Sequence, residues 1–169
     1  MKNNWSNLEA KKYIKKYTKL GHSKDMALRV YTTRLLGRNS KLVLHGGGNT
    51  SVKTSIKDID GKNYDVLCVK GSGWDMAEIE PAGLPAVKLN PLLQLKNKKY
   101  LSDEDMVAYQ KRNLIDIKSP NPSVETFLHA FLPFKFVDHT HADAIMDVTN
   151  RPNGKDLCKK IFGSKVSIV

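Results

Sequence analysis

Cysteines are scarce and long apolar runs are missing from this 169-residue sequence. Its two cysteines, Cys68 and Cys158, allow one disulfide at most, and Cys68 lies in an apolar run typical of a buried thiol. No apolar segment approaches the roughly 20 residues that a membrane-spanning helix needs. The polar N-terminal residues also lack the apolar core of a secretion signal. We therefore expect a protein of the reducing cytoplasm without a membrane partner.

Acidic residues are also few, with 17 Asp and Glu against 28 Lys and Arg and a net charge of +11. The imbalance is greatest in residues 1–40, where Glu9 and Asp25 are the only acids. Such a surface could bind nucleic acid, but the sequence has no zinc-finger spacing, RNP-like aromatic motif or RGG repeat. We favour lysines on the solvent side of two helices, with a field that attracts small anionic substrates, so no nucleic-acid partner is expected.

The remaining composition is that of an ordinary globular protein. Hydrophobic residues make up 40% of the chain and charged residues 27%. The length is sufficient for one domain with a buried core, and no internal repeat or linker interrupts it. Residues 1–169 are therefore expected to form a single α/β domain, or the N-terminal portion of one that is truncated at its C-terminus.

Two helices are expected at the start of the chain. Ser6 begins the first helix as part of a capping box, and an apolar stripe follows at helical spacing until Gly21. Ser23 begins the second helix, which ends at Gly37. This helical hairpin is expected to pack on one face of a sheet.

Three strands and two glycine-rich loops are expected next. Residues 42–44 are apolar, residues 52–56 alternate between apolar and polar, and residues 66–69 are apolar on both faces, as in a central strand. A hairpin turn at Asp60-Gly61 joins the last two strands. The first and third strands each run into a glycine-rich loop, so both loops should lie near each other at one end of the sheet.

The later elements are less regular, and Ser102 and Ser123 are the expected N-caps of two further helices. The second of these helices carries an apolar stripe formed by Val124, Phe127, Leu128 and Phe131. The full expected order is an edge strand near 86–89, helices over about 102–114 and 123–131, a strand over 136–141, helices near 143–149 and 154–162, and the beginning of a strand at 166–169.

A pair of histidines, His139 and His141, is the first candidate for chemistry. If the segment is extended, alternate side chains point to the same face, so the two imidazoles can bind one transition-metal ion. Asp138 and Asp143 could then accept hydrogen bonds from the imidazole N–H groups. Two histidines without a metal, in the core or on the surface, are an equally good interpretation of this motif alone.

Two glycine-rich loops are the second candidate. Residues 46–51, Gly-Gly-Gly-Asn-Thr-Ser, match neither a Walker loop nor a dinucleotide fingerprint, because no Gly-Lys-Ser/Thr follows and a hairpin rather than a helix comes next. Glycines still allow backbone N–H groups to approach an anion. Residues 71–73, Gly-Ser-Gly, offer the same on a second loop. Tight turns without a ligand remain the alternative for each loop.

Glu125 is the third candidate, at the beginning of the helix capped by Ser123. It lies off the apolar stripe, with His129 one turn further on the same side. A carboxylate facing a metal site can serve as a proton shuttle, whereas an ordinary first-turn acid only stabilises its helix. For His129 we favour a surface position.

Four motifs together, in this order, resemble the class II aldolase/adducin family: residues 46–51, Lys-Gly-Ser-Gly at 70–73, Pro-Ser-Val-Glu at 122–125 and Asp-His-Thr-His-Ala-Asp at 138–143. The longer phrases around the two glycine loops are most similar to the N-terminal aldolase part of bifunctional rhamnulose-1-phosphate aldolase/short-chain alcohol dehydrogenase proteins. The resemblance covers roughly residues 5–150.

The resemblance implies a three-layer α/β/α fold with a mainly antiparallel sheet, and a homo-oligomer, a tetramer, with the active site at a subunit boundary. It also implies metal-dependent cleavage of a ketose 1-phosphate, of the rhamnulose- or fuculose-1-phosphate type, to dihydroxyacetone phosphate and an aldehyde. His139 and His141 match the residues that hold Zn²⁺, and Glu125 matches the catalytic acid/base. The positions that match phosphate-binding residues are Gly48, Asn49, Ser72, Gly73 and Ser123.

Two positions depart from the family pattern. Val124 replaces a serine that some members carry before the glutamate. The family's third metal-binding histidine comes from a later strand, but no histidine follows His141. The remaining candidates are His22, His45 and His129, of which we favour His45 because it adjoins the glycine loop. The alternative to an active aldolase is therefore a non-catalytic adducin-like module, or a truncated remnant without a complete metal site.

Overall fold

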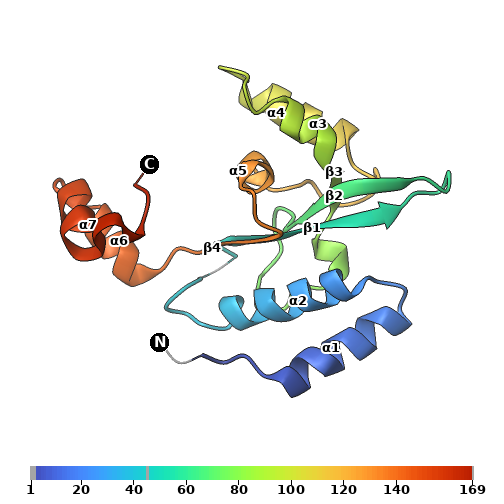
Figure 1. Ribbon diagram of the computed structural model, residues 1–169, viewed down its shortest axis with the longest axis horizontal. Helices are drawn as coiled ribbons and strands as arrows, with labels where there is room; N and C mark the ends of the chain where they lie inside the picture. The colour runs from blue at the N-terminus through green and yellow to red at the C-terminus, as the bar shows by residue number, and fades with distance from the viewer. Residues whose placement is uncertain (1–2, 45, 169) are drawn as a thin grey trace.

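The computed structural model describes residues 3–44 and 46–168, which form a four-stranded antiparallel sheet with helices on both faces (Figure 1). The strands pair in the order β3-β2-β1-β4. Their bounds are β1 (Asn49–Lys57), β2 (Asn63–Val69), β3 (Ala86–Lys88) and β4 (Phe136–His139). Every pair of neighbouring strands is antiparallel. The expected β1–β2 hairpin, the central position of β2 and the edge position of β3 are therefore confirmed.

The N-terminal helices α1 (Asn7–Lys19) and α2 (Lys24–Gly37) cover one face of the sheet. Both begin where the sequence predicts, because the Ser6 and Ser23 hydroxyls accept hydrogen bonds from backbone N–H groups of the first turn. The buried core on this side joins the helices to the sheet through Tyr17, Met26, Ala27, Val30, Val52, Val66, Cys68, Ile79 and Leu84.

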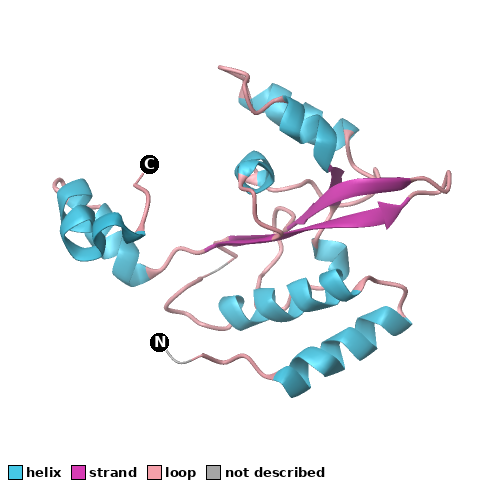
Figure 2. Cartoon of the chain, viewed as in Figure 1, coloured by secondary structure: helices cyan, strands magenta, loops and turns pink. Residues whose placement is uncertain are grey.

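The opposite face is covered by three helices, α3 (Leu89–Gln94), α4 (Asp103–Arg112) and α5 (Thr126–Phe131) (Figure 2). A second buried cluster lies there, formed by Leu67, Val69, Val87, Leu92, Leu114, Phe127 and Ala130. Alternate residues of β2 thus enter two different cores, as expected of a strand that is buried on both sides. The structure confirms an α/β fold with helical layers on both faces of the sheet.

The helices α6 (Asp143–Thr149) and α7 (Gly154–Phe162) follow β4 and pack mainly against each other beside the sheet. Both match the expected positions. Within the described ranges, no helix has the length and apolar character needed to cross a membrane.

Three expectations about elements were wrong. Residues 42–44 are not a strand, because the backbone N–H groups of Leu42 and Val43 both donate to the Asn39 carbonyl in a turn. Residues 166–168 form no strand in the described part of the chain. The helix α5 begins at Thr126 rather than at 124, because the Ser123 carbonyl accepts the Thr126 N–H in a turn that includes Val124 and Glu125.

Candidate active site

The two histidines of the predicted pair converge beyond the end of β4. His139 is the last residue of β4, and His141 lies in the following loop, where its backbone N–H donates to the Leu42 carbonyl at 3.0 Å. Their Nε2 atoms face each other 3.1 Å apart, and the ring centroids are 4.8 Å apart. Two imidazoles on one tetrahedral zinc, with bonds of about 2.0–2.1 Å, would place these atoms roughly 3.3 Å apart. The spacing and the donor type therefore fit a shared transition-metal ion.

Glu125 lies on the other side of the His139 ring. Its Oε1 atom is 3.9 Å from Nδ1 of His139, and this Nδ1 is buried without a hydrogen-bond partner. Burial and the neighbouring His141 lower the pKa of His139, while Glu125 opposes that shift. A neutral ring with its proton on Nδ1, facing the carboxylate, leaves the Nε2 lone pair available to a metal.

Two predicted phosphate donors hold the Glu125 carboxylate in this structure. The Asn49 side-chain amide donates to Oε2 of Glu125 at 3.1 Å, and the Ser123 hydroxyl donates to the same oxygen. Ser123 Oγ also accepts the Glu125 backbone N–H at 3.2 Å. Asn49 and Ser123 are both buried. The carboxylate is therefore fixed by neighbours from β1 and from its own turn.

The first glycine loop packs directly against the histidines. A Cβ on Gly47 would lie 3.3 Å from Nδ1 of His141, and one on Gly48 would lie 2.8 Å from the His139 carbonyl oxygen. Gly48 also has φ +71°, a conformation that L side chains rarely adopt. A larger residue at either position would push on the segment that carries the imidazoles.

The second glycine loop lies beside the Glu125 turn, because the Ser72 N–H donates to the Asn121 carbonyl at 3.0 Å. The residue before this loop, Lys70, donates its backbone N–H to the Thr50 carbonyl at 3.0 Å, next to Asn49. Both loops thus meet at the end of the sheet where Glu125 lies, as the strand order predicts. Ser72 and Gly73 are exposed there.

Lys70 is a candidate residue that the sequence reasoning missed. Its side chain is 5% exposed, and burial lowers the pKa of its amine, while the nearby carboxylates Glu125 and Asp75 oppose that shift. Lysine is rarely buried, so a lysine directly after a strand that is apolar on both faces is unusual. This position was the signal in the sequence that could have identified Lys70.

His129 is not on the surface, so that expectation was wrong. It is fully buried, and its Nδ1 atom lies 2.8 Å from Oγ of Ser51, which is also fully buried. Burial, together with nearby His139, lowers the pKa of His129 to about 4, so the ring is neutral at pH 7. His129 lies one turn after Glu125, as expected, because its backbone N–H donates to the Glu125 carbonyl, and the Glu125 carboxylate is near enough to act on the His129 ring.

Asp138 does not accept a hydrogen bond from the imidazoles as predicted. It points to the opposite face of the sheet and forms a 2.6 Å ion pair with Arg29 of α2. Asp143, the other predicted acceptor, begins α6. His45, the remaining candidate for a third ligand, lies outside the described residues, and residues 3–44 and 46–168 contain no cluster of three His, Cys, Asp or Glu side chains arranged to hold a metal.

Comparison with known proteins defines the class. Residues 27–169 match the model of the class II aldolase and adducin N-terminal domain. The chain therefore belongs to the class II aldolase/adducin family.

One curated protein and one solved structure are similar to this chain. The chain is 43% identical over 136 residues to a Bacillus subtilis (strain 168) protein called "Uncharacterized oxidoreductase YuxG", a match that covers 80% of this chain and 20% of that protein. This chain thus spans about a fifth of the length of that curated relative. A solved structure, the N-terminal class II aldolase domain of a conserved protein from Thermoplasma acidophilum, superposes with a TM-score of 0.82 at 40% identity, over 96% of this chain and 70% of that one.

Proposed function

We propose that this chain carries a metal-dependent aldolase site that cleaves a ketose 1-phosphate to dihydroxyacetone phosphate and an aldehyde. The rhamnulose- and fuculose-1-phosphate type is the favoured substrate. The observation that carries the proposal is the convergence of the His139 and His141 Nε2 atoms, 3.1 Å apart, beside the Glu125 carboxylate. A carboxylate next to such a pair is the arrangement that proton transfer near a metal requires.

His139 and His141 are the residues proposed to hold Zn²⁺ or another divalent transition metal. Imidazole nitrogens at a 3.1 Å spacing suit that ion. When bound, the ion supplies Lewis-acid stabilisation of the negative charge that develops on substrate oxygens during carbon–carbon cleavage.

Glu125 is proposed as the acid/base. In the cleavage direction it delivers a proton to the carbon that becomes part of dihydroxyacetone phosphate, and in the reverse direction it removes that proton. The hydrogen bonds from Asn49 and Ser123 to Oε2 orient the carboxylate and leave Oε1 toward His139. This fixed orientation lowers the entropic cost of the proton transfer.

The substrate phosphate is proposed to bind between the two glycine loops. The groups proposed to bind it are Gly48, Asn49, Ser72, Gly73 and Ser123. We add Lys70, because its largely buried side chain lies at this end of the sheet near Glu125 and its ammonium would complement a phosphate charge. For Asn49 and Ser123, phosphate binding would require exchange of at least part of their hydrogen bonding with Glu125.

A cleavage assay with the zinc-loaded protein and a ketose 1-phosphate tests this function. The Glu125→Gln variant should lose about 10²- to 10⁴-fold in turnover while keeping its zinc affinity. Glu104→Gln, at an exposed position in the first turn of α4, is the matched control and should keep full activity. Turnover that is insensitive to Glu125→Gln would refute the assigned role.

A non-catalytic adducin-like module is the second candidate function. It is favoured by one observation, that the described residues provide two converging histidines but no third metal-binding group. It predicts weak zinc binding and no turnover with any ketose 1-phosphate, whereas the aldolase proposal predicts stoichiometric zinc.

A homo-oligomer in the cytoplasm, a tetramer by family likeness, is also proposed. Light scattering coupled to size-exclusion chromatography would measure the subunit number, and a monomer at micromolar concentration would contradict this part of the proposal.

A further inference from the structure

Within residues 3–44 and 46–168, the strand that carries His139 pairs with one neighbour, β1. β4 is the last strand in the order β3-β2-β1-β4, and it pairs with β1 over four residue pairs, from Asn49↔His139 to Val52↔Phe136. Four residue pairs hold a strand less firmly than the seven pairs that join β1 to β2. The position of His139 therefore depends on whatever else fixes β4.

Arg29 of α2 contacts three consecutive residues of β4 from the opposite face of the sheet. One guanidinium nitrogen, Nη1, donates to the Ser51 carbonyl of β1 at 3.0 Å and to the Val137 carbonyl of β4 at 3.4 Å. Its Nη2 forms the 2.6 Å ion pair with Asp138. The guanidinium also lies 5.5 Å from the centre of the Phe136 ring. A single side chain thus bridges β1 and β4.

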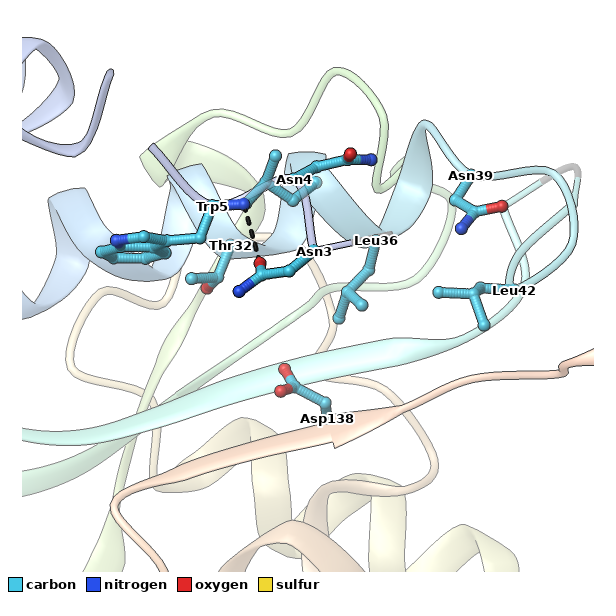
Figure 3. Close-up of a pocket in the computed structure, with 9 residues that line it drawn as sticks. Asn3, Asn4, Trp5, Thr32, Leu36, Asn39, Leu42 and Asp138 are labelled. Atoms are coloured by element: carbon cyan, nitrogen blue, oxygen red, sulfur yellow. Dashed lines mark hydrogen bonds between the residues drawn. The ribbon is translucent and has the colours of Figure 1, made fainter. Parts of the chain in front are cut away.

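The two partners of this ion pair differ sharply in exposure. The Arg29 side chain is 1% exposed and that of Asp138 48%. Asp138 lines a pocket with Trp5, Thr32 and Leu36, and Figure 3 shows its carboxylate on the side of β4 that faces α2. A buried guanidinium costs more free energy than an apolar side chain of similar size. Its rigid fork, however, can bind carbonyls and a carboxylate at once.

The geometry connects this bridge to the proposed metal site. Asp138 and His139 are adjacent in β4, so their side chains point to opposite faces of the sheet. Fixing the backbone at Val137 and Asp138 from the α2 side therefore fixes the direction in which His139 points toward His141 and Glu125. We infer that Arg29 is a positioning residue that holds the histidine strand in register, and this inference relies on the proposed function only for the ligand role of His139.

Two variants and one matched control test the inference in the protein without metal. Arg29→Met removes the bridge, and Asp138→Asn removes only the counter-charge at a half-exposed position. The control is Arg34→Met, because Arg34 lies on the same helix and also binds a carboxylate and backbone carbonyls, those of Glu80, Ile79 and Glu78, away from β4. The readouts are amide hydrogen exchange of β4 relative to β2, and the NMR cross-relaxation between the His139 and His141 rings.

Arg29→Met should make β4 amides exchange at least about tenfold faster relative to β2 and should weaken or abolish the cross-relaxation between the two rings. Arg34→Met should change the amide exchange rates of β4 and β2 by the same factor and should keep the cross-relaxation between the His139 and His141 rings. If Arg29→Met does not fold, Asp138→Asn replaces it as the test. It should also speed amide exchange of β4 relative to β2 and weaken the cross-relaxation, but by less. Uniform exchange and an intact ring contact in the folded variants would overturn the inference.

Zinc affinity separates this inference from the proposed function. If the wild-type chain binds zinc through His139, Arg29→Met should bind it about 10- to 100-fold more weakly, and an unchanged affinity would overturn the positioning role. If the wild-type chain binds no zinc, the proposed function fails, and the exchange and ring-contact measurements alone decide whether Arg29 positions His139.

Discussion

The two faces of β1 and β4 differ in how completely their buried polar groups are paired. On the face toward α2, polar side chains bind one another: the hydroxyls of Thr33 and Thr50 are 2.7 Å apart, and Arg29 pairs with Asp138. On the face toward α5, Asn49 binds Glu125 and Ser51 binds His129.

The α5 face nevertheless retains unused binding capacity. Of four buried side-chain polar atoms that lack a partner in the described ranges, three lie at this face: Asn49 Oδ1, His129 Nε2 and His139 Nδ1. Native interiors rarely leave such groups unpaired without a reason. Neighbouring residues of the same strands therefore pair with one another on one face and leave polar atoms unpaired on the other, where the proposed site lies.

The largest effect on the face that carries the proposed site is expected from a methyl group at Gly48. Gly48→Ala should lower the free energy of unfolding by about 2–4 kcal/mol, because a strained backbone is combined with overpacking against the His139 carbonyl. Gly73→Ala is the control, since Gly73 has φ +81° but no atom within 4 Å of an added Cβ. It should cost only about 1–2 kcal/mol. Equal losses in urea unfolding would contradict the close packing of the loop on β4.

The buried His129 should make stability depend on pH. In the unfolded protein it takes up a proton near its ordinary pKa of 6.5, but in the folded protein only near 4. The stability that it contributes at pH 7 is therefore lost as the pH falls through this window, by about 2 kcal/mol at pH 4.5.

Urea unfolding at pH 7 and 4.5 measures this loss. His129→Asn should remove most of that pH dependence, whereas His22→Asn, at an exposed position between α1 and α2, should keep it. An unchanged slope in His129→Asn would show that the ring is not held neutral by burial.

The smallest expected effect concerns Lys70. Lys70→Met should raise the KM for a ketose 1-phosphate, or the Kd for inorganic phosphate, by about tenfold, because a charge-assisted hydrogen bond is lost. Lys62→Met, in the hairpin turn between β1 and β2, is the control and should leave both constants unchanged. Unaltered phosphate binding in Lys70→Met would remove this residue from the proposed cradle.

Local chemistry made much of the fold predictable. Hydroxyl caps at Ser6, Ser23 and Ser102 begin α1, α2 and α4 as expected. The run at residues 42–44 was misassigned because apolar character alone does not show that a turn at Asn39 already binds the backbone N–H groups. Whether such a segment forms a turn or a strand depends on its backbone geometry, which the order of apolar and polar residues does not show.

The closeness of the candidate residues was predictable from the sequence, but the partners that each side chain contacts were not. The motifs correctly bring together Glu125, His139 and the glycine loops. The α5 helix has only six residues, too few for a periodic pattern to show that His129 faces β1. The pairing of Arg29 with Asp138 joins residues more than a hundred positions apart, which no local rule could reveal.

Zinc titration of the wild-type chain and of His139→Ala and His141→Ala tests the central claim most directly, with His22→Ala as the control. We predict one zinc per chain in the wild type and the control, and an affinity at least about 100-fold weaker in each of the other two variants. Wild-type affinity in both His139→Ala and His141→Ala would contradict a metal site built on this pair.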